Sequence, residues 1–442
     1  MKKRLQLWPV RIPTLLAMWW RMRVRKPLVT GVERTGARSF IVFRLDSLGD
    51  VVMTTPLFRA LKAAFPKSRC TAVVQRNYKA LLATNPHIDE ILTLPNVRPE
   101  WLPQRLRKLL AALWLYQTEL RKRHFDFAIS PRWDTDEHLA TLLCVLSNAA
   151  TRVGYSETAT AAKRKMNRGF DRAFDICLPP GPPRHEVLRN LAIAEALGAT
   201  ACDTRPEVRV TERDRRHADE LLVKVPRSAK LVSLGIGAQS PGRRWPLERY
   251  AETLAALETV HRMWPVIVCS SAEFGDALKL AETLRRPPVI VSGAPLRQVC
   301  AVLERCELFI GNDSGCAHLA AAMGCRTVVI SRHPGGGDPN HFNSPVRFSP
   351  QGRQVRVLQP ASGADECRAA CSHLEPHCIK LVSPEEVAAV AHEMLAQPAV
   401  LAPVVASKWP PRIRPVLLDS HSADGLLKAM EALHPTAAQP PL

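Results

Sequence analysis

Residues 307–330, ELFIGNDSGCAHLAAAMGCRTVVI, constrain the possible fold of this chain more than any other stretch. An apolar run at 308–310 predicts a buried strand. A polar turn follows, then a helix rich in small residues, and then a second apolar run at 327–330. Strand, turn, helix and strand in this order predict a βαβ unit. Such units build open α/β sheets, which bind ligands at the carboxyl ends of their strands.

The turn between the first strand and the helix has the residues of a ligand-binding loop. Gly311 and Gly315 let the backbone approach a ligand closely. Asp313 and Ser314 precede a helix whose free N–H groups suit a phosphate. A structural interpretation is equally open at this point, in which Asp313 and Ser314 only cap the helix and His318 packs on a helix face.

The length and charge of the chain define its class. With 442 residues it can form two or three domains with full hydrophobic cores. Its net charge of +20 predicts an anionic partner, which could be a nucleic acid, a membrane surface or a phosphorylated substrate. The sequence contains no run of ~18 apolar residues and no recognisable signal peptide. Its 12 cysteines are mostly isolated, and we expect a cytoplasmic protein with reduced thiols.

Both ends of the chain differ from the middle. Residues 1–38 carry ten Lys and Arg residues and one acid, with Trp8, Trp19 and Trp20 between them. This composition favours a basic arm that attaches to an anionic membrane surface, and a disordered tail is the alternative. Residues 399–442 form a Pro-rich tail with one helical candidate at 423–433.

In the middle of the chain, predicted strands alternate with predicted helices. In its first part the pattern predicts strands at 39–45, 70–74, 91–94 and 125–130, and helices at 51–65, 102–120 and 185–197. In its second part it predicts strands at 231–235, 266–269, 289–291, 308–310 and 328–330, and helices that begin at 247 and 384. A break at 178–183 and a junction at 203–206 separate the parts. We therefore predict two α/β domains, 39–205 and 206–398.

The predicted helix at 102–120 has an apolar face, formed by Leu102, Leu106, Leu109, Leu110 and Leu113, and basic residues elsewhere. We expect this face to pack on the sheet. The alternative is a helix that lies on a membrane surface.

The loop after the first predicted strand can supply a base. It reads DSLGD at 46–50, and Asp50 lies at the start of a helix, where the helix dipole favours an ionised carboxylate. Such a carboxylate can accept a proton from a sugar hydroxyl. The alternative role is that of an ordinary helix-start acid.

The loop after the first strand of the second part can hold a diphosphate. Residues 236–246 carry Ser240, Arg243 and Arg244. Arginines opposite a helix N-terminus can clamp a diphosphate without a metal. The alternative is a pair of surface arginines.

Three segments together resemble the heptosyltransferase family of glycosyltransferases, glycosyltransferase family nine. FIVFRLDSLGDVVMTTPLFRALKAAFP resembles the opening motif of that family. GAQSPGRRWPLERY resembles its second motif, in which a basic residue precedes Trp-Pro, and FIGNDSGCAHLAAAMGCRTVVI resembles its third. The three occur in the family order and spacing, and the resemblance covers about residues 39–396.

This resemblance implies a GT-B fold, in which two Rossmann-like domains with parallel sheets face each other across a cleft. It places the acceptor on residues 39–205 and the nucleotide sugar on residues 206–398. It implies inverting transfer of a heptose from ADP-heptose to the inner core of lipopolysaccharide, without a metal or another cofactor. The implied partners are an ADP-sugar and lipopolysaccharide or a similar anionic glycolipid, at the inner face of the inner membrane, with no nucleic acid.

The motifs also imply site residues. Asp50 corresponds to the catalytic base of the family, and Arg243 to the residue that meets the donor diphosphate, where the family often has lysine. The donor-binding positions are Ser240, Arg243, Arg244, Asp313, Ser314, Gly315 and His318. The acceptor-side loop contributes Asp46, Ser47 and Gly49. Asp46 stands where the family usually has serine, so a second carboxylate lies near the base.

A late cluster of Cys367, Cys371, Cys378, His373 and His377 differs in spacing from paired CxxC zinc sites, and we predict no metal there.

Three alternatives to this function remain open. The same fold could use another nucleotide sugar or glycan acceptor. A basic nucleic-acid-binding protein is disfavoured by the small number of tyrosines, four, and by the absence of a recognisable nucleic-acid module. A nucleotide-binding protein without catalysis is disfavoured by Asp50.

Overall fold

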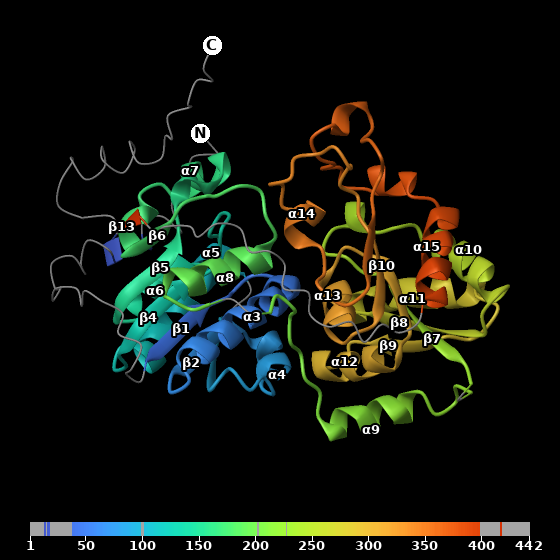
Figure 1. Ribbon diagram of the computed structural model, residues 1–442, viewed down its shortest axis with the longest axis horizontal. Coiled ribbons are helices and arrows are strands. Elements are labelled where there is room, and N and C mark those ends of the chain that lie inside the picture. The colour runs from blue at the N-terminus through green and yellow to red at the C-terminus, as the bar shows by residue number, and fades with distance from the viewer. Residues whose placement is uncertain are drawn as a thin grey trace, which may run out of the picture.

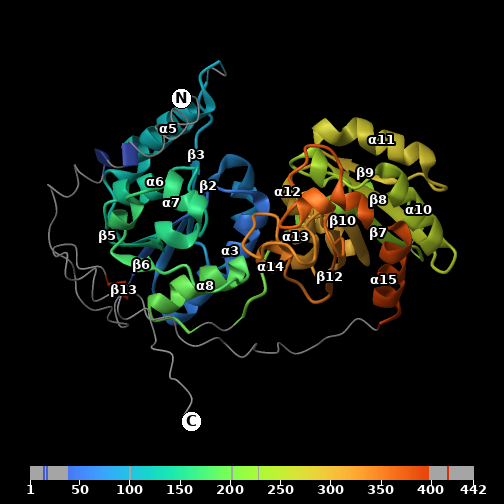
Figure 2. The same ribbon diagram turned by 90° about the horizontal axis from the view of Figure 1, so that it is seen from above.

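The computed structural model describes residues 13–14, 16–17, 38–98, 101–200, 203–226, 228–397 and 416–417. Two separate sheets lie side by side in these residues, each covered by helices on both faces (Figures 1 and 2). We call residues 38–200 the N-terminal half and residues 203–397 the C-terminal half. Most of the basic arm and the helical candidate at 423–433 lie outside the described residues.

The sheet of the N-terminal half has the strand order β13-β6-β5-β4-β1-β2-β3. Its strands are parallel except for β13, which pairs antiparallel with β6. The strands are β1 (Ser39–Phe43), β2 (Arg69–Gln75), β3 (Glu90–Leu94), β4 (Phe125–Ser130), β5 (Ala149–Tyr155), β6 (Ile176–Leu178) and β13 (Val416–Leu417).

Alternate residues of β1 point to the two faces of this sheet. Phe40 and Val42 pack under α3 and α8, whereas Ile41 and Phe43 pack under α5 and α6. The helices of this half are α3 (Leu48–Ala64), α4 (Lys79–Leu82), α5 (Gln104–Leu115), α6 (Ala140–Leu146), α7 (Ala161–Met166) and α8 (Glu186–Ala196).

The sheet of the C-terminal half has the order β12-β11-β10-β7-β8-β9, and all its strands are parallel. The strands are β7 (Lys230–Gly235), β8 (Met263–Cys269), β9 (Val289–Ser292), β10 (Leu308–Asn312), β11 (Arg326–Ile330) and β12 (Val355–Leu358). The helices are α9 (Glu212–Leu221), α10 (Leu247–Glu258), α11 (Phe274–Thr283), α12 (Leu296–Arg305), α13 (Gly315–Ala322), α14 (Pro345–Phe348) and α15 (Pro384–Ala396). Residues of α10, α11 and α15 cover one face, and residues of α9, α12 and α13 cover the other.

The α/β class and every predicted strand are confirmed, but the sequence pattern missed three parallel strands. Arg152 interrupts β5, where it is buried and pairs with Asp175 (Nε to Oδ2, 3.0 Å). β6 has only three residues, and β12 is a half-exposed edge strand in which Arg356 alternates with valines. The domain limits at 205 and 206 stay predictions.

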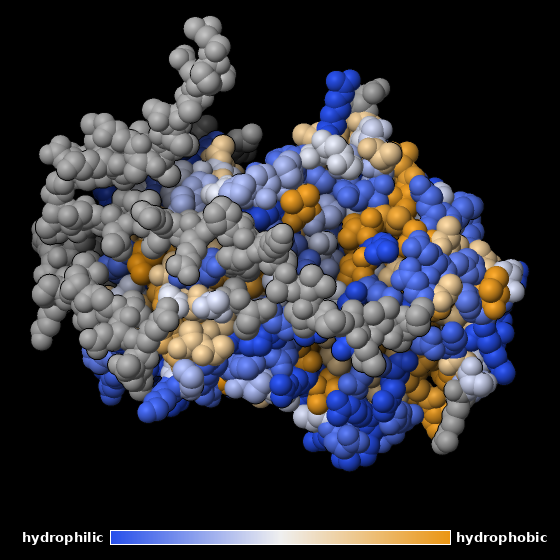
Figure 3. Space-filling model, viewed as in Figure 1, coloured by the Kyte–Doolittle hydropathy of each residue, from blue (hydrophilic) through white to orange (hydrophobic). Residues whose placement is uncertain are grey.

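The packing of α5 differs from expectation. Leu106, Leu110 and Leu113 are exposed, and the face against the sheet is formed by Ala111, Ala112 and Leu115 together with Leu109 of the predicted face. The two small alanine side chains let the helix approach the sheet closely. An apolar stripe on α5 therefore faces outward. None of the helices in the described ranges is long and apolar enough to cross a membrane. In the view of Figure 1 the surface is mainly hydrophilic, with separate apolar patches over the C-terminal half (Figure 3).

Candidate active site between the two halves

Arg243 and Asp313 join two loops at the carboxyl end of the second sheet. Arg243 lies in a 3₁₀ turn, Pro241–Arg243, after β7, and Asp313 directly follows β10. The guanidinium Nη2 donates to Asp313 Oδ2 at 2.9 Å and to the backbone oxygen of the same residue. Within the described ranges Ser314 makes no capping hydrogen bond to α13 through its side chain. Side-chain capping of α13 therefore does not explain Ser314, and the N–H groups that begin α13 suit a phosphate.

Arg244 points to a different part of the sheet edge. It contacts Glu273 (Nη2 to Oε1, 3.4 Å) and Asp276 (Nη1 to Oδ2, 3.7 Å), which follow β8. Because β7 lies between β10 and β8, consecutive arginines after β7 reach opposite neighbours. The structure therefore brings Arg243, but not Arg244, to the turn at Asp313. Ser240 precedes the 3₁₀ turn and is half-buried.

Asn312 joins the loop after β7 to the loop after β10, and the sequence analysis missed it. Its side chain is fully buried. Nδ2 donates to the backbone oxygen of Ile236 at 2.7 Å, and Oδ1 accepts from the backbone N–H of Trp245 at 2.9 Å and from the hydroxyl of Tyr250 at 3.1 Å. A polar side chain at the end of an otherwise apolar strand is the signal that could have revealed it.

Asp50 and Asp46 share two arginines on the other half. Arg44 contacts Asp46 (Nη1 to Oδ2, 3.1 Å) and Asp50 (Nη2 to Oδ1, 3.6 Å). Arg132 contacts the Oδ2 atoms of Asp46 at 3.5 Å and of Asp50 at 3.8 Å. Asp50 Oδ2 also accepts from the backbone N–H of Ser47 at 3.2 Å, so Asp50 lies in the first turn of α3. The sequence analysis missed both arginines, although an arginine at the end of an apolar strand is a visible signal.

The two carboxyl groups differ in pKa. Burial raises the pKa of Asp50, and the neighbouring Asp46 charge adds to this, against the opposing effect of Arg44. Burial also acts on Asp46, but Arg132 and Arg44 outweigh it and hold the pKa of that carboxyl below its usual value. We expected the helix start to favour an ionised Asp50. The raised pKa of Asp50 is opposite to that expectation, because burial and Asp46 outweigh Arg44 and Arg132.

The N-termini of α3 and α13 meet where the halves touch. A side-chain carbon added at Gly49 would come within 2.8 Å of the His318 ring, and one added at Gly315 within 2.8 Å of Leu48. His318 is buried, and its Nδ1 has no hydrogen-bond partner among the described residues. Burial, with the nearby His185 and Arg243, lowers its pKa to about 3, so the ring is neutral at pH 7. The loop of Asp50 therefore lies directly against the helix that follows Asp313.

A cavity of about 1000 Å³ opens beside the acceptor-side loop. Asp46 and Ser47 line it on one side, and Gln239 reaches it from the C-terminal half. Its cationic lining comes from Arg76, Arg98, Arg107 and Lys108, and His138 lies beside them. A cavity with several cationic side chains attracts an anionic molecule.

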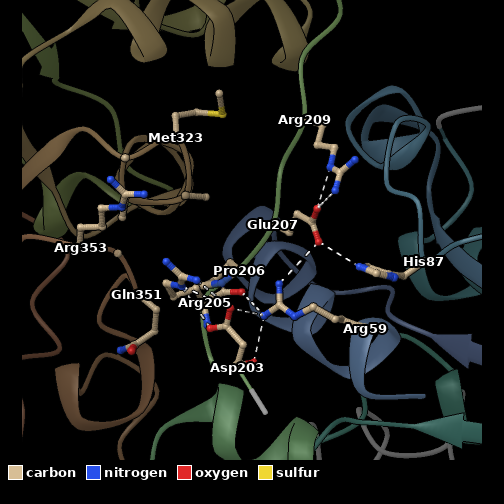
Figure 4. Close-up of a pocket in the computed structure, with 14 residues that line it drawn as sticks. Arg59, His87, Asp203, Arg205, Pro206, Glu207, Arg209, Met323, Gln351 and Arg353 are labelled. Carbon is tan, nitrogen blue, oxygen red and sulfur yellow. Dashed lines mark hydrogen bonds and ion pairs between the residues drawn. The ribbon is translucent and has the colours of Figure 1, made fainter. Parts of the chain in front are cut away.

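A second cavity, of about 610 Å³, lies at the segment that joins the halves (Figure 4). Arg59 extends from α3 toward Asp203 (Nη2 to Oδ2, 3.6 Å) and Glu207 (Nη1 to Oε2, 3.5 Å). Arg59 is nine residues from Asp50 on one helix, about 14 Å along its axis. None of the site residues predicted from the sequence lines this cavity.

Comparison with known proteins gives a consistent result. The model of glycosyltransferase family 9 (heptosyltransferase) matches residues 115–365. The chain is 23% identical over 327 residues to the lipopolysaccharide core heptosyltransferase OpsX of Haemophilus influenzae, covering 73% of this chain and 84% of that protein. Among solved structures it is similar to a family 9 glycosyl transferase from Veillonella parvula, with a TM-score of 0.66 and 20% identity, covering 82% of this chain and 99% of the other.

The Escherichia coli heptosyltransferase WaaC, solved with ADP, has a TM-score of 0.57 and 14% identity over 80% of this chain and 99% of its own. These likenesses support the GT-B arrangement of two sheets with flanking helices that the sequence predicts. Because the family model matches more than half of this chain, the chain belongs to glycosyltransferase family 9, the heptosyltransferases.

Proposed function

We propose that this glycosyltransferase moves a heptose from ADP-heptose to the inner core of lipopolysaccharide, with inversion at the anomeric carbon. The observation that carries the proposal is the contact of Gly49 with His318, because it sets the loop of Asp50 against the turn that suits a phosphate. Similar proteins support the choice of donor. WaaC has been solved with ADP and with ADP-2-deoxy-2-fluoro heptose.

The donor binds, in this proposal, to residues 206–398. Arg243 contacts the diphosphate, and the backbone N–H groups at Ser314 and Gly315 complete the site. Asp313 orients the Arg243 guanidinium through the bond of 2.9 Å. Arg244 and Ser240 act at the rim of the same loop.

Asp50 acts as the general base. A carboxylate with a raised pKa is a better proton acceptor than an ordinary one, provided that it is ionised at the working pH. Asp50 takes the proton of the acceptor hydroxyl, the oxygen forms a bond to the anomeric carbon, and the ADP leaves with the bonding electrons. Asp46 stays ionised and holds Arg44 and Arg132 in place.

The acceptor binds, in this proposal, to residues 39–205 in the cavity of about 1000 Å³. The cationic side chains that line it match the anionic groups of a lipopolysaccharide core or a similar glycolipid. This is why we favour a lipopolysaccharide acceptor over a neutral glycan.

We further propose peripheral attachment to the inner face of the inner membrane. The exposed stripe of Leu106, Leu110 and Leu113 lies on α5, whose Arg107 and Lys108 line the acceptor cavity. An apolar stripe beside basic residues suits an anionic lipid surface. Co-sedimentation with anionic liposomes tests this. Binding should weaken with salt, with deletion of residues 1–36 and with aspartate at the three leucines. Full binding by a protein that lacks residues 1–36 and carries aspartate at all three leucines would contradict the proposed attachment.

The decisive experiment incubates the full chain with a panel of nucleotide sugars and truncated lipopolysaccharides. We expect release of ADP and a mass increment of one heptose on an inner-core acceptor. Transfer from another nucleotide sugar alone would show that ADP-heptose is not the donor. Absence of transfer from every donor, by folded protein that binds ADP, would contradict the proposal.

A further inference from the structure

Three thiols surround one imidazole on the loop after β12. Sγ atoms of Cys367, Cys371 and Cys378 lie 3.7, 3.9 and 3.4 Å from Nδ1 of His377. All four ligand atoms lie within 4.8 Å of one another. The three cysteines are almost completely buried and form their own small cluster. Like the other cysteines in the described ranges, they are free thiols.

These spacings match a tetrahedral metal site. Zinc–sulfur bonds of about 2.3 Å and a zinc–nitrogen bond of about 2.0 Å at the tetrahedral angle place sulfur and nitrogen about 3.5 Å apart. The three observed sulfur–nitrogen distances, 3.4–3.9 Å, bracket that value. A hydrophobic cluster alone does not require that three sulfurs converge on one ring nitrogen.

The second nitrogen of the same ring is also engaged. Nε2 of His377 lies 3.4 Å from Oε1 of Glu366. A histidine that binds a metal commonly directs its other ring nitrogen to a carboxylate, which fixes the ring and the tautomer. His373 stacks on His377 with ring centroids 4.0 Å apart, and its Nε2 also lies 3.4 Å from Glu366. The burial of the three thiols favours the set of Cys367, Cys371, Cys378 and His377 over one that uses His373.

We propose that Cys367, Cys371, Cys378 and His377 bind one divalent transition-metal ion, with zinc as the occupant that a closed set of three thiolates and one imidazole prefers. This proposal differs from the prediction of no metal, which rested on spacing along the chain. Two 3₁₀ turns, Asp365–Cys367 and Cys378–Leu381, fold the segment back so that residues eleven apart meet.

The proposed ion has a structural role, because its ligands frame a segment that supports the loop of Arg243. The backbone oxygen of His373 accepts from Arg332 Nη1 at 2.9 Å, and a side-chain carbon added at Gly242 would collide with that same oxygen. Farther along, Arg249 Nη1 donates to the backbone oxygens of Lys380 and Val382 at 2.6 and 2.7 Å. A fixed conformation of residues 367–378 therefore supports the backbone of residues 241–243.

Metal analysis of the full chain tests the site without any use of its enzymatic activity. Protein purified under reducing conditions and passed through gel filtration should contain about one zinc ion per chain. Cys371→Ser and Cys378→Ser should lose it. Reconstitution with Co²⁺ should give the charge-transfer absorption of a thiolate-bound ion in the wild type and not in these variants.

Matched controls separate the four ligands from other buried groups. Cys300→Ser changes a fully buried thiol of α12 in the same half, and it should keep the metal. His373→Ala should also keep it, whereas His377→Ala should lose it. Wild-type protein that takes up neither Zn²⁺ nor Co²⁺, or Cys371→Ser protein that keeps its metal, would overturn the proposal. Stoichiometric iron would uphold the four ligands and overturn zinc as the occupant.

Hydrogen exchange tests the structural role. Removal of the metal by a chelator should speed amide exchange in residues 367–382 and 240–249 and leave β1 to β4 unchanged. Unchanged exchange in both segments after complete loss of the metal would overturn the supporting role.

Discussion

Arg347 of α14 forms a buried ion pair with Glu186 of α8, Nη2 to Oε1 at 2.8 Å, and so joins the two halves of the molecule. Both side chains are almost completely buried. Glu186 also pairs with Arg189 at 2.7 Å, and Arg347 with Asp134 at 3.0 Å. Each charge therefore has more than one partner, as a buried ion requires.

Loss of Arg347 should destabilise the protein strongly. Arg347→Ala leaves Glu186 and Asp134 with one cationic partner fewer in a buried site, which typically costs about 3–5 kcal/mol. Urea unfolding followed by fluorescence should show a clearly lower midpoint. Arg356→Ala is the control, because that arginine is half-exposed and lies 3.9 Å from Glu393, and such pairs contribute about 0–1 kcal/mol. Equal midpoints for the two variants would contradict the role of Arg347.

The same network predicts acid sensitivity. Glu186 is buried, but Arg347 and Arg189 outweigh the burial and lower its pKa from 4.5 to about 2. A carboxyl with a lowered folded pKa contributes stability that is present above its unfolded pKa and is lost as the pH falls through the folded one. About 3 kcal/mol should therefore disappear between about pH 4.5 and 2. The free energy of unfolding of Glu186→Gln should depend less on pH in this range, and parallel curves for both proteins would rule this contribution out.

The carboxylates of Asp46 and Asp50 should respond differently to amidation. Asp50→Asn removes the proposed base and should lower turnover on the order of 10²–10⁴-fold, while ADP binding stays intact. Asp46→Asn should cost less turnover but more stability, because Asp46 lies 3.1 Å from Arg44 and has the lowered pKa. Turnover, ADP affinity and melting curves of both variants test this.

The pH profile gives a separate check on Asp50. The base must be ionised, so kcat/KM should rise with pH through the pKa of Asp50, which burial raises above its ordinary value, and then level off. Folded Asp50→Asn with near-normal turnover, together with an inactive Asp46→Asn, would assign the base to Asp46. Full activity in both would disprove the mechanism.

Arg243 and Arg244 should differ in donor binding, although they are neighbours. Arg243→Ala should weaken ADP binding by about 1.5–3 kcal/mol, the usual contribution of a hydrogen bond to a charged group. Arg244→Ala should weaken it less, because that side chain faces Glu273 and Asp276. Calorimetric titration with ADP measures both. Equal ADP affinity in Arg243→Ala and the wild type would remove Arg243 from the site.

Gly49 should tolerate no side chain. Gly49→Ala places a methyl group within 2.8 Å of the buried His318 ring, so the two halves must separate slightly at the proposed reaction centre. Turnover should fall at least about tenfold, since misplacement by about 1 Å costs far more than a lost contact. Gly275→Ala is a matched control in α11, where a methyl group meets nothing within 4 Å. Similar turnover in both variants would show that the close approach is unimportant.

The sequence predicted the sheets well and the tertiary contacts around the candidate site poorly. Continuous apolar runs such as 308–310 are buried on both faces and are easily recognised, whereas β5 contains Arg152 and gives no such run. The motif positions Asp50 and Arg243 were visible as local patterns. Arg44 and Arg132, which contact Asp50, and Asn312, which joins the loops after β7 and β10, had only the signal of a polar residue at a strand end, because tertiary packing brings them to the site. The same reason explains the thiol cluster, whose spacing along the chain hides its proximity in space.

Helix α3 carries Asp50 at its start and Arg59 near its end, where Arg59 binds the segment that connects the halves. The helix thus connects the segment that joins the halves to the position of Asp50. A rotation of about 10° around Arg59 moves Asp50, about 14 Å away along the helix, by about 2 Å. Any displacement of the connecting segment that turns α3 would therefore also shift the carboxyl group of Asp50.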